Sequence, residues 1–127
     1  MATAEDNQEA LKKLNGEWAV ASMEMMGKQM PAEAVKKIRL INTDGEYLVR
    51  AESDDKGSVS VDAAKSPKQM TIKGSDGPNK GKTLLAIYEL KEDELKICYD
   101  LSGKEFPKEF KTEPGKLLMM AVYKKVK

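Results

Sequence analysis

The 127-residue chain contains no histidine and only one cysteine, Cys98. A single cysteine cannot form a disulfide within the chain, so we expect the fold to depend on its hydrophobic core. The lack of histidine removes the commonest general base at neutral pH and the commonest zinc ligand. It also excludes the serine and cysteine triads that rely on an imidazole. We therefore expect a protein that is not an enzyme and that holds no metal or cofactor.

Neither an excess of one charge nor a long apolar run is present. Lysine and arginine total 22 and aspartate and glutamate 21, which leaves a net charge of +1. Binding to nucleic acid needs a concentrated basic excess, so we expect no nucleic-acid partner. The lysines near the end of the chain are typical of a solvated strand end. No apolar stretch approaches the ~18 residues that a membrane span requires, so we expect no membrane insertion.

The chain starts with a short polar stretch. We expect residues 1–5 to form a disordered tail, followed by a single domain over residues 6–127. Ala2-Thr3-Ala4 has the small-x-small form that precedes signal-peptidase cleavage. Two interpretations stay open at this point: an expression start, or a mature exported protein, periplasmic or secreted, whose signal has been removed.

Two short helices are predicted in the first third of the chain. Asp6-Asn7-Gln8-Glu9 fits a capping box with Asp6 as N-cap, and Asn15-Gly16 fits a left-handed helix stop. Residues 30–37 have proline at the first helical position, an acid in the first turn and lysines in the last. That order suits the helix dipole and predicts a second helix there.

The remainder of the chain has the pattern of short antiparallel strands. Asp44-Gly45 and Lys91-Glu92-Asp93 are turn signals between apolar runs. The expected strands cover residues 18–23, 38–41, 47–50, 58–61, 69–72, 83–90, 94–99 and 116–126. Closing such a sheet removes its exposed edges. The predicted fold is all-β: a roughly eight-stranded antiparallel up-and-down barrel, with one helix before the first strand and one between the first two strands.

Trp18 is the only tryptophan, and it follows the helix stop by two residues. We expect the first helix to lie across one end of the barrel with Leu11 and Leu14 pointing inward. Gly16 then lets the chain turn, and Trp18 fills the tapering interior at that end. The expected structural residues are therefore Leu11, Leu14, Gly16 and Trp18.

These residues also carry a family resemblance. Gly16-Glu17-Trp18 after a short helix looks like the Gly-x-Trp signature of lipocalins and related calycin barrels. Most of the chain resembles an uncharacterised family of bacterial lipocalin-like domains that is abundant in planctomycetes. The stretches that carry this similarity are residues 11–18, 31–35, 76–83, 87–90 and 109–115. The resemblance implies a lipocalin-like barrel, and members of that family often carry export signals.

The first functional hypothesis is a binding protein for one small apolar or amphipathic molecule, because an eight-stranded barrel can hold one such ligand. The second helix would then cover the mouth as a lid. Either of the two arginines, Arg39 or Arg50, is expected to pair with an acidic head group if its side chain points inward. Methionine is adaptable packing that can mould around varied ligands. The predicted lining is Val20, Leu40, Val49, Ile87, Ile97, Tyr99 and Met119.

The alternative hypothesis is a non-catalytic structural or protein-interaction module with a filled barrel core. Its contacts would come from residues 106–110 and from the faces of the first and last strands.

Three further motifs give only weak indications of function. Residues 76–83 superficially resemble a phosphate-binding loop, but they lack its first glycine and the helix that must follow, so a hairpin loop is expected. The acidic groups at 52–55 and 92–94 are expected to be solvated turns.

Overall fold

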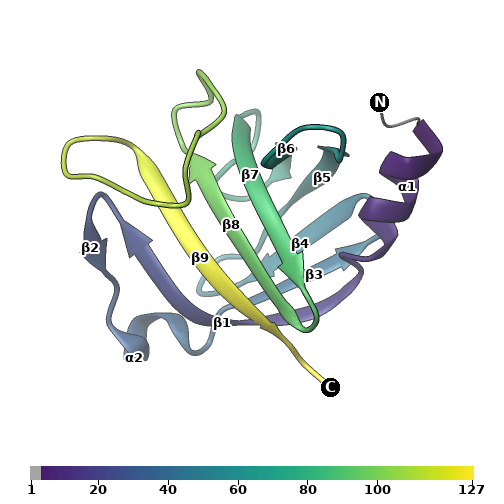
Figure 1. Ribbon diagram of the computed structural model, residues 1–127. Helices are drawn as coiled ribbons and strands as arrows, with labels where there is room; N and C mark the ends of the chain where they lie inside the picture. Colours follow the sequence, from purple (N-terminus) through teal and green to yellow (C-terminus); the bar gives the residue numbers. More distant parts are fainter. Residues whose placement is uncertain (1–3) are drawn as a thin grey trace.

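The computed structural model describes residues 4–127 (Figure 1). Residues 1–3, which make up most of the predicted tail, lie outside the described residues. The elements are α1 (Ala4–Lys12), β1 (Gly16–Met25), β2 (Lys28–Gln29), α2 (Ala32–Val35), β3 (Arg39–Thr43), β4 (Glu46–Arg50), β5 (Asp55–Asp62), β6 (Lys68–Asp76), β7 (Thr83–Lys91), β8 (Glu94–Asp100) and β9 (Leu118–Lys125).

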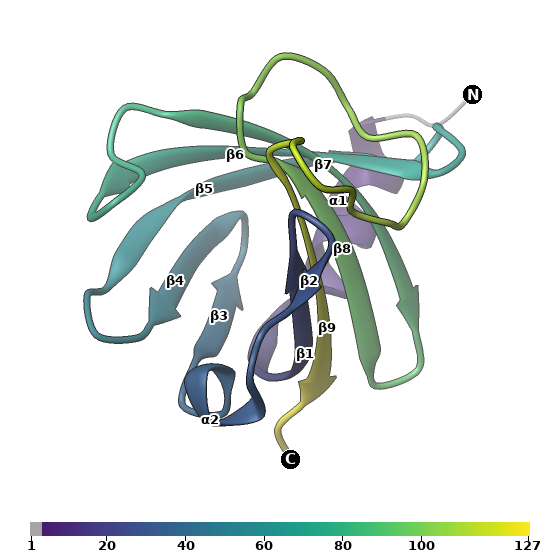
Figure 2. The same ribbon diagram turned by 90° about the vertical axis from the view of Figure 1, so that its left-hand side faces the viewer.

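The strands form a closed ring, visible from the side in Figure 1 and along its length in Figure 2. Each strand from β3 to β8 pairs antiparallel with the next one in sequence, and β1 pairs with both β3 and β9. The result is an eight-stranded antiparallel up-and-down barrel with two short helices, which confirms the predicted fold class. Closure leaves no free edge in the ring of strands.

Both helices differ from their predicted bounds. α1 begins at Ala4, ahead of the predicted capping residue Asp6, because alanine and glutamate favour the first turn of a helix. It ends at Lys12, residues 13–15 form the link, and Gly16 is the first residue of β1. α2 covers only Ala32–Val35, with Pro31 as its N-cap rather than its first residue.

The short hairpin β1–β2 was not predicted. Its turn is Met26-Gly27, with φ values of 50° and 83°. Those values suit a two-residue hairpin turn, which normally has asparagine, aspartate or glycine at the first position. Because methionine rarely adopts a positive φ, the sequence carried no turn signal at this point.

One end of the barrel, the closed end, is packed around Trp18, which is fully buried. Its indole Nε1 donates a hydrogen bond to the carbonyl oxygen of Leu14 (2.9 Å), and the Lys125 ammonium lies 5.2 Å from the ring centre. Leu14 is buried and Leu11 packs against the core from α1. Gly16 has φ +127°, a backbone conformation that favours glycine, and the Lys125 side chain passes beside it.

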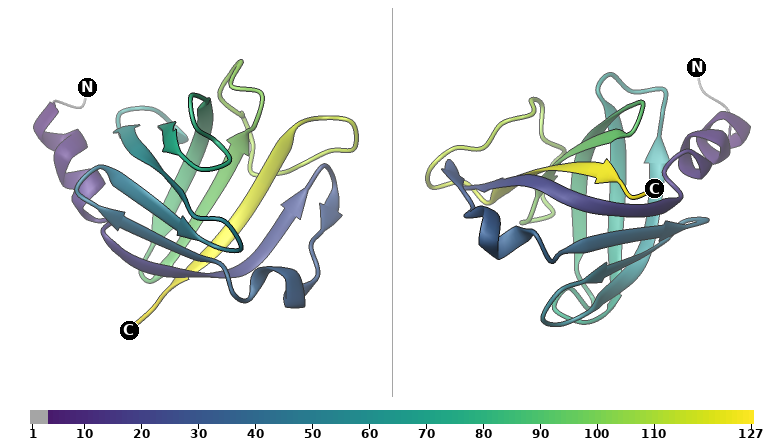
Figure 3. Two further views of the ribbon diagram at one scale, coloured as in Figure 1. Left: turned by 180° about the vertical axis from the view of Figure 1, so that it is seen from behind. Right: turned by 90° about the horizontal axis from the view of Figure 1, so that it is seen from below.

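The helix α1 lies beside this closed end, next to the ends of the hairpins (Figure 3). The Asn7 side chain accepts a hydrogen bond from the backbone amide of Ala63, between β5 and β6. Asn15 and Asp44 exchange two hydrogen bonds, which tie the α1–β1 link to the β3–β4 turn. No helix in the described part of the chain is long and apolar enough to cross a membrane.

The long connection between β8 and β9, residues 101–117, folds back over the outside of the barrel. Cys98 faces outward from β8, yet it is fully buried and its thiol contacts the carbonyl oxygen of Lys111 (3.5 Å). The Thr112 hydroxyl bridges the Glu24 carboxylate and the Gly27 amide of the β1–β2 hairpin. The Cys98 thiol thus points away from the interior and is completely covered.

Replacement of Trp18 with alanine tests the importance of the closed end. We expect Trp18→Ala to lower the free energy of unfolding by about 3–5 kcal/mol, because it empties a fully buried site. Leu117→Ala is the matched control: Leu117 is 54% exposed, and its loss should change stability by at most about 0.5 kcal/mol. Urea unfolding followed by far-UV circular dichroism measures both. Equal effects of the two changes would contradict the assigned role of Trp18.

Candidate functional site: the barrel cavity

The barrel interior contains a cavity of about 170 Å³ whose lining includes Leu40, the register partner of Trp18, but not Trp18 itself. The end of the barrel away from α1, the open end, is formed by the 51–54 turn, the 77–82 loop and the segment around α2 (Figure 2). The lining consists of Met23, Ile38, Leu40, Asn42, Tyr47, Val49, Asp55, Val59, Met70, Ile72, Asn79, Leu84, Ile97, Tyr99, Met119 and Tyr123. It is mainly apolar, with a few polar groups.

Most of the predicted apolar lining meets at this cavity. Leu40, Val49, Ile97, Tyr99 and Met119 all contribute to its wall. They come from β3, β4, β8 and β9, and in register Leu40 lies opposite Val49 and Tyr99 opposite Met119. The strand alternation of the sequence thus brings together residues that are far apart along the chain.

Two predicted residues lie elsewhere. Val20 is buried near Trp18, in the filled part of the core, and does not line the cavity. Ile87 lies between Ala86 and Tyr88, which belong to the inner core, so its side chain faces outward. It is nevertheless only 1% exposed and lies opposite Cys98. The expectation that Ile87 contributes to the interior is therefore wrong.

Neither arginine enters the cavity. Arg39 and Arg50 lie opposite each other on β3 and β4, next to Leu40 and Val49, which face inward. Arg39 donates hydrogen bonds to the backbone oxygens of Lys36 and Ile38 on the outside of the barrel. Because adjacent residues of a strand face opposite sides, the two guanidinium groups point away from the interior.

The charged group that does reach the cavity is Asp55, which is only 7% exposed. The Asn79 side-chain amide donates to its Oδ2 (2.8 Å), and the Tyr47 hydroxyl donates to the same oxygen (3.3 Å). The Asn79 backbone amide reaches Oδ1 at a longer 3.4 Å. Asp55 was expected in a solvated acidic turn; instead it is the first residue of β5 and belongs to the cavity wall.

The 77–82 loop places Asn79 on this carboxylate. Gly77 has φ +91°, and a Cβ there would lie 2.2 Å from the carbonyl oxygen of Asp54. Only glycine allows the loop to approach β5 this closely. The loop joins antiparallel strands, as predicted, and no helix follows it. What the sequence did not reveal is that this loop supplies a polar group to the interior.

Three tyrosines complete the polar part of the cavity. The hydroxyl oxygens of Tyr99 and Tyr123 lie 2.7 Å apart and share a hydrogen bond. Burial, together with the charge and hydrogen bond of Asp55, raises the pKa of Tyr47 from 10.0 to about 12. Burial also raises the pKa of Tyr123 to about 12, and burial and the neighbouring Tyr123 raise the pKa of Tyr99 well above its usual value. All three phenols therefore remain neutral donors at physiological pH.

Asp55 and Tyr47 were missed, although the sequence contains a signal for each. Val59 lines the cavity, and residues that differ by an even number along one strand share a face. Asp55 is four positions before Val59, and Tyr47 two before Val49, so both share the inward face. The sequence did not show that β5 begins at Asp55, three residues before the clear alternation at 58–61.

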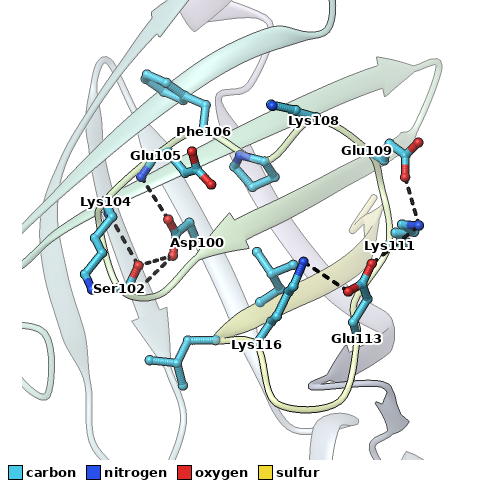
Figure 4. A pocket seen from close by; sticks show the side chains of 13 residues that line it. Asp100, Ser102, Lys104, Glu105, Phe106, Lys108, Glu109, Lys111, Glu113 and Lys116 are labelled. Carbon is cyan, nitrogen blue, oxygen red and sulfur yellow. Dashed lines mark hydrogen bonds and ion pairs between the residues drawn. The ribbon is translucent and has the colours of Figure 1, made fainter.

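A second, larger hollow of about 560 Å³ lies outside the barrel, within the connection between β8 and β9 (Figure 4). Burial alone would raise the pKa of Asp100, but hydrogen bonds from Ser102 and from the Glu105 backbone amide lower it overall. Glu113 pairs with Lys111 and Lys116 on the surface. These contacts organise the connection itself, and acidic and basic side chains balance around the hollow.

Comparisons of the chain with protein families, with curated proteins and with solved structures found no match. Within residues 4–127, no group of three or more histidine, cysteine or acidic side chains converges as metal ligands would. The cavity with Asp55 at its polar end is therefore the best candidate for a functional site, because it combines an apolar wall with a few placed polar groups.

The cavity phenols give a testable alkaline titration. Their native pKa lies above the unfolded value of 10.0, so the unfolded chain loses protons first as the pH rises. The stabilisation is thus fully present below pH 10 and is lost between about pH 10 and 12. Absorbance at 295 nm should show no phenolate at pH 10 in the native protein, and a midpoint near pH 10 in urea. Native phenolate with a midpoint at pH 10 would contradict the burial of these groups.

Proposed function

We propose that the protein binds one small, largely apolar molecule inside the barrel and that it is not an enzyme. The observation that carries this proposal is the interior cavity of about 170 Å³, lined by aliphatic, methionine and tyrosine side chains. Interiors are normally packed with few voids larger than a water molecule. An unfilled apolar space of this size is consistent with a place for a ligand.

The volume of the cavity limits the size of the ligand that it can hold. An apolar cavity of about 150 Å³ is enough to bind benzene, whereas drug-sized ligands occupy pockets of about 300–1,000 Å³. The interior therefore suits a molecule near the size of one substituted aromatic ring. A long fatty-acid chain would need side chains to move out of the core.

Methionine makes that wall adaptable. Met23, Met70 and Met119 all line the cavity, from β1, β6 and β9. The unbranched thioether side chain changes shape at little cost, so it can close around ligands of different outline. The lid role predicted for residues 30–37 fits the position of Val35, buried in the core beside Ile38 of the cavity wall.

The alternative, an interaction module with a filled core, has less support. Phe106 and Phe110 are both half-buried, and the Lys96 ammonium lies 5.8 Å from the Phe110 ring centre. The segment thus packs on its own barrel instead of standing free for a partner. The presence of a cavity also argues against a completely filled core.

The proposed family relation rests on the start of β1. Gly16 and Trp18 stand at the head of the first strand directly after a short helix, and the tryptophan packs in the closed end of a closed barrel. This arrangement supports the resemblance to bacterial lipocalin-like domains. We extend to this chain only the general capacity of such barrels to hold a small molecule.

Filling the cavity tests the proposal. Val49→Phe places a ring in the cavity, whereas Leu48→Phe, one residue away, places it on the opposite face of β4. We expect indole, a small neutral probe, to bind the wild-type chain and Leu48→Phe alike, and to bind Val49→Phe at least about tenfold more weakly because its space is occupied. Isothermal titration calorimetry measures the affinities.

Two results would overturn the proposal. One is the absence of indole binding to the wild-type chain, together with no binding of other single-ring probes such as toluene. The other is equal loss of binding in both phenylalanine variants, which would place the probe outside the barrel. Circular dichroism of each variant confirms that the barrel is intact.

A further inference from the structure

The polar groups of the cavity bear on which ligand charge the barrel favours. The inference drawn from them rests on the proposed function. Asp55 accepts hydrogen bonds from Tyr47 and Asn79, three donor contacts in all, and two of them go to the same oxygen. A carboxylate has about four acceptor sites on its two oxygens. Oδ1, whose one contact is the long 3.4 Å bond from the Asn79 backbone, retains capacity for a further donor.

Among the described residues, no cationic side chain forms an ion pair with the Asp55 carboxylate. The cavity lining includes neither lysine nor arginine. A buried carboxylate without a counter-charge is costly, because neutral donors only partly replace its hydration. A ligand that brings a positive charge would supply the missing partner.

The aromatic side chains around the cavity favour the same ligand class. Tyr47, Tyr99 and Tyr123 line the wall together with Asp55. The faces of aromatic rings attract ammonium groups. An acidic head group would meet the opposite situation: it would lie near a carboxylate of the same charge, with both arginines on the outer surface.

We infer that the barrel selects a small protonated amine with an apolar, ring-sized body, and that its ammonium group donates to Asp55. The apolar body lies against Leu40, Ile97 and Met119, and the ammonium faces the open end, where Asp55 and Asn79 meet. This assignment reverses the head-group charge expected from the arginines.

Three probes of similar size and different charge test the inference: phenethylamine, 2-phenylethanol and phenylacetate, titrated calorimetrically at pH 7. We expect phenethylamine to bind the wild-type chain at least about tenfold more tightly than the neutral alcohol, since hydrogen bonds to charged groups exceed neutral ones. Phenylacetate should bind more weakly than the alcohol.

Asp55→Asn should abolish the preference for the amine while still binding the alcohol. Asp54→Asn is the matched control, because Asp54 is the exposed neighbour and its loss removes the same formal charge. The control should keep the wild-type order of affinities. If Asp55→Asn does not fold, the order of the three probes on the wild-type chain and on Asp54→Asn decides the question.

The failure of this inference differs from failure of the proposed function. If the alcohol binds as tightly as the amine and Val49→Phe weakens both, the barrel binds ligands and the charge preference is overturned. If Asp55→Asn lowers stability but leaves the order of probes unchanged, Asp55 only anchors the 77–82 loop, and the inference is again overturned. If none of the three probes binds, the charge preference is overturned, and the proposed function fails with it only when indole and toluene do not bind either.

Discussion

The pairing of β1 with two partners is the constraint on which the rest of the structure depends. Its first residues pair with β3 and most of its length pairs with β9, with a register shift between Val20 and Ser22. Through this strand the sheet becomes a ring, and its backbone donors and acceptors are satisfied at both edges. Without closure there would be no enclosed interior, and the residues facing it would line an open sheet.

Closure also explains why the two ends of the barrel differ. At one end, Trp18 fills the interior with a single large side chain, and its indole N–H donates a hydrogen bond to the Leu14 carbonyl oxygen. That end is packed. Beyond it, the interior wall consists of aliphatic, methionine and tyrosine side chains such as Val49, Met119 and Tyr99, which leave space between them. The closed end is thus filled by core packing, and the candidate site lies in the part of the interior that Trp18 does not fill.

The polar end of the cavity is built by segments that approach one another only after the ring has formed. Asp55 begins β5, and Asn79 belongs to the loop that follows β6. Gly77 allows that loop to pass against the backbone of residue 54. Three neutral donor contacts hold the carboxylate inside a mainly apolar wall and fix the position of the 77–82 loop.

The local pattern of the sequence was enough to determine the class of fold. Alternation in residues 94–99 and the turn signal at Asp44-Gly45 depend on neighbours in the chain, so the strands and the inward set Leu40, Val49, Ile97 and Tyr99 followed from it. The prediction for Ile87 was wrong because β7 is apolar on both faces, so the alternation of residue types did not indicate which face is inward.

Only the tertiary structure decided which polar groups enter the interior and how much space remains there. Arg39 and Arg50 point outward because they alternate with the inward-facing Leu40 and Val49, whereas Asp55 points inward because β5 starts three residues ahead of the clear alternation at 58–61. The cover over Cys98 likewise comes from a connection whose path is set by distant contacts to Glu24 and Gly27. Cavity volume depends on how side chains from all the strands meet, which is a property of the closed ring and not of any one segment.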